Sequence, residues 1–104
     1  MSFVAFSEAA ELDIGRFYDF LKPNGRDVAE AAITAIFASL TLLETLPLSG
    51  APVSEASGLR KFVIGYGGSG YVAFYKYYRQ TDTAVIAKIF HQREGYTKNG
   101  LKIL

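Results

Sequence analysis

The chain of 104 residues contains no cysteine and only one histidine, His91. The absence of cysteine excludes disulfide bonds and cysteine-ligated metal sites, and it fits a protein of a reducing compartment. A zinc site built from several imidazoles cannot form within one chain that has a single histidine. We therefore expect neither a metal nor another cofactor.

Long apolar segments are also missing. The longest uncharged run covers residues 31–43, AAITAIFASLTLL. It is shorter than the roughly 20 apolar residues that a membrane-spanning helix needs. The N-terminus has no basic stretch ahead of an apolar run, which is the pattern of a secretory signal. These absences predict a soluble protein in which residues 31–43 belong to a buried helix.

A large excess of charge of either sign is absent, because the formal net charge is only +1. Proteins that bind nucleic-acid phosphates usually carry a larger basic excess. The charges are unevenly placed, however. From residue 59 onward, eight lysines and arginines face only two acids, Asp82 and Glu94. The C-terminal half is therefore basic and the N-terminal half is acidic.

Half of the residues are hydrophobic, and seven tyrosines and eight phenylalanines supply large contact areas. The length suits one domain, residues 1–104. Residues 59–96 contain three apolar runs separated by short turn signals at residues 67–70 and 80–83. Connections this short make neighbouring strands antiparallel, so this stretch predicts a three-stranded meander. The glycines at residues 67–70 suit a turn with positive φ, which Gly70 in particular would need.

Two helices are predicted before the meander. Ser7 is a good N-cap for the first, and Ala10, Ile14, Phe17 and Leu21 form its apolar stripe. Residues 22–25, KPNG, end this helix. Asn24 can cap the second helix, which should run to about Leu46.

The second helix has two apolar stripes. The first carries large side chains: Ala29, Ile33, Ile36, Leu40 and Leu43. The second is made mostly of small ones: Ala31, Ala35, Ala38 and Leu42. A helix that is apolar on two sides is buried on two sides. We expect the large stripe to face the sheet and the alanine stripe to contact the first helix in an antiparallel hairpin.

The period-2 pattern assigns the strand faces. In the middle strand, one face carries Tyr71, Ala73, Tyr75 and Tyr77, and the other carries Val72, Phe74, Lys76 and Tyr78. In the last strand, one face carries Val85, Ala87, Ile89 and His91, and the other carries Ala84, Ile86, Lys88 and Phe90. One sheet face should pack under the helices. The other keeps aromatic and basic groups available for a partner or nucleic acid.

Residues 2–6, SFVAF, suit an edge strand added to the meander. The sequence thus predicts an α+β fold with a helical hairpin packed on a small antiparallel sheet. Residues 97–104 extend past the meander, and they either add a strand, pack on the body or order with a partner.

The ordered set of segments resembles the RelE/ParE superfamily of bacterial type II toxins. The segments are DIGRFYDFLKPNG, LETLPLSGAPV, LRKFVIGYGGSGYVAFYK and VIAKIFHQREGY, and the last closes on a His-x-Arg-x-x-Tyr pattern. The resemblance covers residues 3–96 and implies the hairpin-on-sheet fold. It also implies a cytoplasmic bacterial protein that forms a hetero-oligomer with an antitoxin, as in plasmid stabilisation systems.

The resemblance leaves two activities open. ParE-like toxins inhibit DNA gyrase by binding, whereas RelE-like toxins cleave mRNA on the ribosome without metal. The small net charge, and a sheet whose basic groups are mainly Arg60, Lys61 and Lys76, favour the ParE-like branch. A toxin-fold protein that is inactive and retained for partner binding is a third hypothesis.

If the chain is RelE-like, the matching residues are His91, Arg93, Arg60, Lys61 and Tyr96. RNA cleavage needs a base, a cation for the phosphorane charge and an acid. The alternative interpretation is structural: His91 is a hydrogen-bonded surface residue, Arg93 and Glu94 form a surface ion pair, and Tyr96 covers the core. Arg60, Lys61, Lys76 and Arg93 are then candidates for binding a partner such as the antitoxin. We expect the antitoxin to cover the exposed sheet surface or the hairpin groove.

The other catalytic patterns are missing. The glycines at residues 65–70 connect two strands rather than a strand and a helix, so they do not form a phosphate-binding loop. No serine lies in a nucleophile motif.

Overall fold

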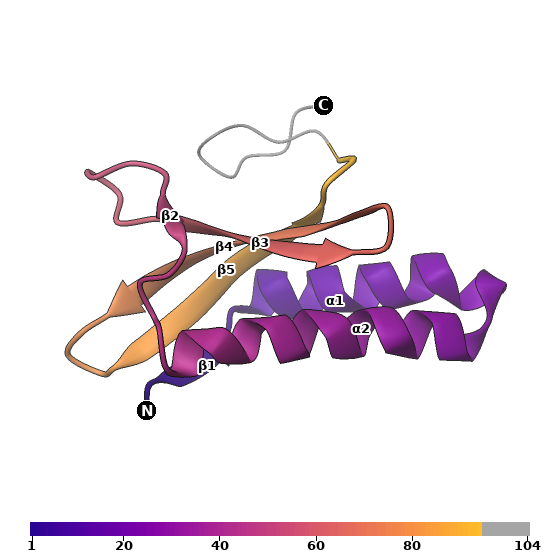
Figure 1. Ribbon diagram of the computed structural model, residues 1–104, viewed down its shortest axis with the longest axis horizontal. Coiled ribbons are helices and arrows are strands. Elements are labelled where there is room, and N and C mark those ends of the chain that lie inside the picture. Colours follow the sequence, from indigo (N-terminus) through magenta and orange to yellow (C-terminus); the bar gives the residue numbers. More distant parts are fainter. Residues whose placement is uncertain (95–104) are drawn as a thin grey trace.

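The computed structural model describes residues 1–94, so Tyr96 and the segment 97–104 lie outside the described residues (Figure 1). The elements in chain order are β1 (Phe3–Phe6), α1 (Glu8–Leu21), the 3-10 turn η1 (Lys22–Asn24), α2 (Arg26–Leu40), the 3-10 turn η2 (Thr41–Glu44), β2 (Ala51–Pro52), β3 (Arg60–Tyr66), β4 (Ser69–Tyr78) and β5 (Thr83–His91).

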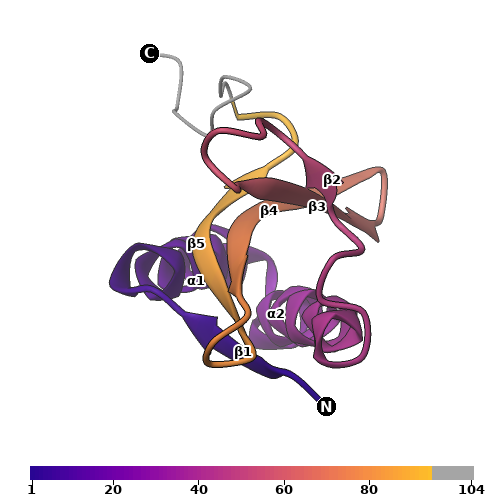
Figure 2. The same ribbon diagram turned by 90° about the vertical axis from the view of Figure 1, so that its left-hand side faces the viewer.

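The five strands form one sheet in the order β1-β5-β4-β3-β2, and α1 and α2 lie side by side on one of its faces (Figures 1 and 2). The predicted antiparallel meander β3-β4-β5 is confirmed, and the two-residue β2 adds antiparallel to β3. β1 is the predicted edge strand. It pairs with β5 in parallel, from Phe3 with Thr83 to Phe6 with Ile86. The α+β fold is confirmed, with a sheet that is mixed rather than wholly antiparallel.

The start of α1 follows the prediction. Ser7 is its N-cap, and the Ser7 Oγ accepts a hydrogen bond of 3.1 Å from the Ala10 backbone N–H. The same Oγ donates to the Ala87 carbonyl of β5 over 2.8 Å. Ala10 and Phe17 of the predicted stripe are buried, and Ile14 and Leu21 are partly buried. The cap therefore fixes both the start of α1 and its position beside β5.

Two predictions for α2 are wrong at its ends. Its N-cap is Gly25, with φ 122°, and not Asn24. Asn24 is the last residue of the turn η1 and therefore lies one position before the N-cap. The α-helix ends at Leu40, and η2 continues it only to Glu44, rather than to about Leu46. A 3-10 turn keeps the apolar side chains at helix-like spacing, so the pattern extends past the α-helix.

The large stripe of α2 does face the core, and Ala29, Ile36, Leu40 and Leu43 are buried. Most of the alanine stripe does not pack against α1 as predicted, because Ala31, Ala38 and Leu42 are exposed and only Ala35 is partly buried. The small side chains that α2 buries are instead Ala29 and Ala32. Alanine is the best helix former, and this propensity accounts for exposed alanines without any packing.

The predicted faces of β4 are confirmed, whereas those of β5 are wrong. Phe74 pairs with Lys88 but Tyr75 pairs with Ile86, which leaves Ala87 as an extra residue in β5. Such a bulge shifts the alternation by one residue. Ile86 and Ile89 therefore both belong to the core under the helices. Phe90 joins a second cluster on the opposite face with Val72, Phe74, Val53 and Leu59.

The turns hold the sheet in register. Gly67 and Gly70 have the predicted positive φ, of 61° and 120°. In the β4–β5 turn, Asp82 has φ 49° and accepts hydrogen bonds from the hydroxyls of Ser2 and Tyr77. These two bonds lower the pKa of Asp82. Asp82 therefore attaches the start of β1 to the turn before β5.

The segment between α2 and β3 is fixed by a buried tyrosine. The Tyr75 hydroxyl accepts from the Gly50 N–H at 2.9 Å and donates to the Pro47 carbonyl at 2.8 Å. A Cβ added at Gly50 would lie 2.6 Å from Cε1 of Tyr75 and 3.0 Å from the Lys61 carbonyl oxygen. Position 50 therefore has no room for a larger side chain.

We predict that Gly50→Ala lowers the free energy of unfolding by about 1–3 kcal/mol, because the buried ring of Tyr75 has to move. Gly15→Ala is the matched control. Gly15 lies inside α1 with nothing within 4 Å of an added Cβ, so this change should stabilise the protein by about 1 kcal/mol. Denaturant unfolding of both variants measures the difference, and equal midpoints would show that the segment yields without strain.

Candidate functional site

His91 is the last residue of β5 and pairs with Tyr71 of β4. The two rings meet edge to face, with their centroids 5.2 Å apart. The next residue, Gln92, donates its N–H to the Gly70 carbonyl, which turns the chain away from the sheet. The ladder therefore holds the imidazole at the end of the sheet, on the face that the helices cover.

Both ring nitrogens of His91 have hydrogen-bond partners. The Nδ1 accepts from the Arg93 backbone N–H over 3.2 Å, and the Nε2 lies 3.2 Å from the Ser69 Oγ. A nitrogen that accepts a hydrogen bond carries no proton, so the neutral imidazole has its proton on Nε2. In this tautomer Nε2–H donates to Ser69, which cannot transfer its own proton to the same nitrogen. His91 and Ser69 are therefore not arranged as a base and its nucleophile.

A buried carboxylate lies beside this site and was not foreseen from the sequence. Asp13 of α1 is only 2% exposed. Its Oδ2 accepts the backbone N–H of Ile89 at 2.8 Å, and its Oδ1 accepts the Lys88 ammonium at 2.7 Å. Arg16 contributes a third contact at 3.3 Å. An acid beside the apolar residue Ile14 in the stripe was the available signal, because buried carboxylates have to be paired.

Arg16 connects this carboxylate to the residues after β5. Its Nη1 donates to both carboxylate oxygens of Glu94 at 3.0 Å, and Glu94 also accepts the His91 backbone N–H at 2.9 Å. Burial alone would lower the pKa of Arg16, but its hydrogen bonds to Glu94 and Asp13 raise it. The sequence interpretation paired Glu94 with Arg93, whereas the structure pairs Glu94 with Arg16 of α1.

A cavity of about 390 Å³ adjoins His91 and lies between α1 and the ends of β4 and β5. Its lining is mainly apolar, from Phe17, Phe20, Leu21 and Tyr71, with Arg16 and Glu94 at its polar side. Burial raises the pKa of the Tyr71 phenol, which stays protonated at neutral pH. The cavity suits an apolar ligand group better than a phosphate, because the carboxylates of Asp13 and Glu94 already neutralise Arg16.

Arg60 does not join His91. It pairs with Tyr75, four residues along β4 from the partner of His91, which corresponds to about 13 Å. Its Nη1 donates to the carbonyls of Gly50 at 2.7 Å and Leu48 at 3.1 Å. Arg60 thus holds the segment before β2 in place.

The remaining candidates are dispersed. Lys61 pairs with Phe74, and Lys76 follows Phe74 by two residues, so both lie on the sheet face without helices. Arg93 is exposed in the turn after β5 and meets His91 through its backbone. Tyr96 is outside the described residues. Of the five residues predicted for RNA cleavage, four lie within residues 1–94, and among these four the structure brings together only His91 and Arg93.

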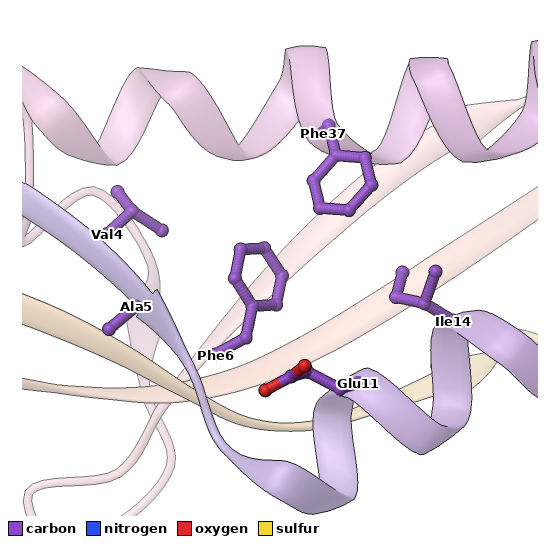
Figure 3. A pocket seen from close by; sticks show the side chains of 6 residues that line it. All are labelled: Val4, Ala5, Phe6, Glu11, Ile14 and Phe37. Atoms are coloured by element: carbon purple, nitrogen blue, oxygen red, sulfur yellow. The ribbon is translucent and has the colours of Figure 1, made fainter.

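A second hollow lies at the other end of α1. A cavity of about 410 Å³ is lined by Val4, Ala5 and Phe6 of β1, Glu11 and Ile14 of α1, and Phe37 of α2 (Figure 3). A smaller cavity of about 190 Å³ shares Val4, Phe6 and Phe37 with it and extends to Leu40, Thr41 and Glu44. We call this the β1 groove, and sequence reasoning missed it because its walls come from three separate elements.

Neither hollow is a metal site. Within residues 1–94, no three side chains of the metal-ligating types lie close enough together to hold an ion. In the same part of the chain, no helix is long and apolar enough to cross a bilayer.

We predict that Asp13→Ala lowers the free energy of unfolding by about 1–3 kcal/mol, because it leaves the Ile89 N–H unpaired. Asp13→Asn keeps an acceptor for that N–H but removes the charge facing Lys88 and Arg16, so it should be intermediate. Asp19→Ala, an exposed acid on the same helix, should change stability by less than about 0.5 kcal/mol. Urea unfolding compares the three, and equal losses at positions 13 and 19 would contradict the importance of the carboxylate.

The chain matches the family model for the ParE toxin of the type II toxin–antitoxin system parDE over residues 4–96. A structure of the chromosomal ParDE toxin–antitoxin system from P. aeruginosa is similar in fold, with a TM-score of 0.70 and 18% identity over 88% of this chain and 96% of that chain. The intact E. coli RelBE toxin–antitoxin complex gives a TM-score of 0.53 and 18% identity over 86% and 94%. A search of curated proteins found no match. Because the family model spans nearly the whole sequence, the chain belongs to the ParE toxin family of type II toxin–antitoxin systems.

Proposed function

We propose that this toxin stops bacterial growth by binding DNA gyrase, and that a cognate antitoxin neutralises it in the cytoplasm. The observation that carries the proposal is the hydrogen bonding of His91. Its Nδ1 is used by a backbone N–H, and its Nε2 faces Ser69. These bonds support a structural role for the only imidazole in the chain.

The placement of the cations supports the same proposal. Arg60 binds two carbonyls about 13 Å along β4 from the partner of His91. Lys61 and Lys76 lie on the opposite face of the sheet from His91. Cleavage of RNA needs a base and a cation within reach of one phosphate. Within residues 1–94, the cations nearest His91 are Arg16, which is already paired with Asp13 and Glu94, and Arg93. A toxin acting by binding therefore fits these residues better than a nuclease.

Ribosome-dependent cleavage of mRNA is the alternative, and His91 with Arg93 would carry it. Catalysis by His91 would require the imidazole to leave its present hydrogen bonds. The fold similarity to the toxin of the RelBE complex is the observation that favours this alternative. An inactive protein retained only for antitoxin binding would neither inhibit gyrase nor cleave mRNA.

We predict that the purified, antitoxin-free protein inhibits DNA supercoiling by gyrase at near-stoichiometric amounts, and that His91→Ala inhibits equally well. Arg93→Ala is tested beside it, because the nuclease alternative uses both side chains. Circular dichroism first establishes that each variant is folded.

If growth arrest persists while gyrase is unaffected by the wild-type protein, the gyrase proposal fails. If folded His91→Ala loses toxicity in cells and wild type cleaves mRNA in a translation extract, the nuclease is the function. If neither activity is present, the chain is an inactive member of its family.

A further inference from the structure

The β1 groove exposes apolar surface that residues 1–94 leave uncovered. Val4 and Phe6 point toward α2 because alternate residues of β1 share a face, and Phe3 and Ala5 point away. The Phe6 and Phe37 rings meet edge to face at 5.3 Å (Figure 3). Phe37 is nevertheless 43% exposed. An aromatic pair that remains open to solvent over an apolar hollow marks a binding surface.

Both ends of the groove are acidic. Glu11 closes one end beside Ile14, and Glu44 closes the other beside Thr41. Among the ion pairs of residues 1–94, neither carboxylate has a partner. Glu8 lies in the same turn of α1 as Glu11 and is exposed like it, whereas Glu44 is partly buried. The groove is thus apolar in its middle and negative at its ends.

Its length limits what can bind. From Phe37, which lines both hollows, to Glu44 at one end, seven residues along α2 and η2 correspond to about 10 Å. That distance equals about three residues of extended chain. The two hollows of about 410 and 190 Å³ therefore accommodate a few apolar side chains from one short segment.

We propose that the β1 groove binds a short segment of the antitoxin whose apolar side chains are flanked by lysine or arginine. This inference rests on the proposed role as a type II toxin. The charge at the groove ends selects a basic-flanked segment, because an acidic one would face Glu11 and Glu44. The basic sheet face with Lys61 and Lys76 would receive any acidic part of the antitoxin, so the two surfaces take opposite charges from one partner.

The first experiment measures how much the acidic side chains at the groove ends contribute to antitoxin affinity. The affinity of the toxin for its purified cognate antitoxin is determined at 50 mM and 500 mM NaCl. Glu11→Lys/Glu44→Lys should weaken binding at least tenfold at low salt, and much less at high salt, because the ion pairs are screened. Asp19→Lys/Glu30→Lys makes the same change of charge at exposed helix positions outside the groove and should bind nearly as wild type does.

The second experiment measures the apolar contact. Phe37→Ala should weaken antitoxin binding at least tenfold, whereas Tyr66→Ala, a change of an exposed aromatic residue at the end of β3, outside the groove and off the basic sheet face, should not. A photo-crosslinking phenylalanine placed at position 37 then identifies the antitoxin segment. We expect this segment to carry lysine or arginine on both sides of its apolar residues.

The inference is overturned if the groove variants bind the antitoxin as wild type does, if the control variants lose as much affinity, or if the crosslinked segment is acidic. It is also overturned if the groove variants lose only gyrase inhibition, because the groove would then bind the target. A toxin that binds no antitoxin overturns both this inference and neutralisation by an antitoxin. If the groove variants lose antitoxin binding but the wild-type toxin does not inhibit gyrase, the inference stands and the gyrase proposal fails.

Discussion

The carboxylate of Asp13 closes the edge of β5 where β1 ends. β1 pairs with β5 as far as Ile86, and beyond that point no strand from residues 1–94 lies beside the outer edge of β5. Ser7 takes over, because its N–H donates to the Ile86 carbonyl and its hydroxyl donates to the Ala87 carbonyl. Asp13 then accepts the Ile89 N–H. Ser7 and the first half of α1 thus take the place of a neighbouring strand and fix α1 against the sheet. They also cover a strand edge that could otherwise pair with another chain.

The position of α1 in turn determines both hollows. Its last turns, with Arg16 and Phe17, border the cavity at His91, and its first turns, with Glu11 and Ile14, border the β1 groove. The two sites therefore lie at opposite ends of one rigid helix. The site at His91 is held by paired charges and internal hydrogen bonds, whereas the groove keeps exposed apolar side chains and acids without ion pairs in residues 1–94. This difference makes the groove the more suitable surface for a protein partner.

The elements of the fold followed from the sequence because local signals decide them. Ser7 capped α1, the glycines turned β3 into β4, and the apolar periods marked both helices. The failures arose where tertiary structure outweighs the local pattern. The bulge at Ala87 reversed the faces of the residues of β5 that follow it, and no residue pattern in the segment 83–91 indicates a bulge. Asp13 acquires its role from a backbone N–H 76 positions away. Arg60 could be recognised as a cation, but its carbonyl partners depend on how the segment before β2 folds back.

The pairing of the first strand with the last has a consequence for synthesis on the ribosome. β1 cannot find its place until residues 83–86 of β5 have been made, about 80 residues after β1 itself leaves the peptidyl-transferase centre. At about 5–20 residues per second, this delay lasts several seconds. The β1 groove, which needs Val4 and Phe6 in position, therefore exists only on a chain that has been made at least as far as residue 86. Any partner that recognises the groove distinguishes a chain that includes β5 from a shorter nascent one.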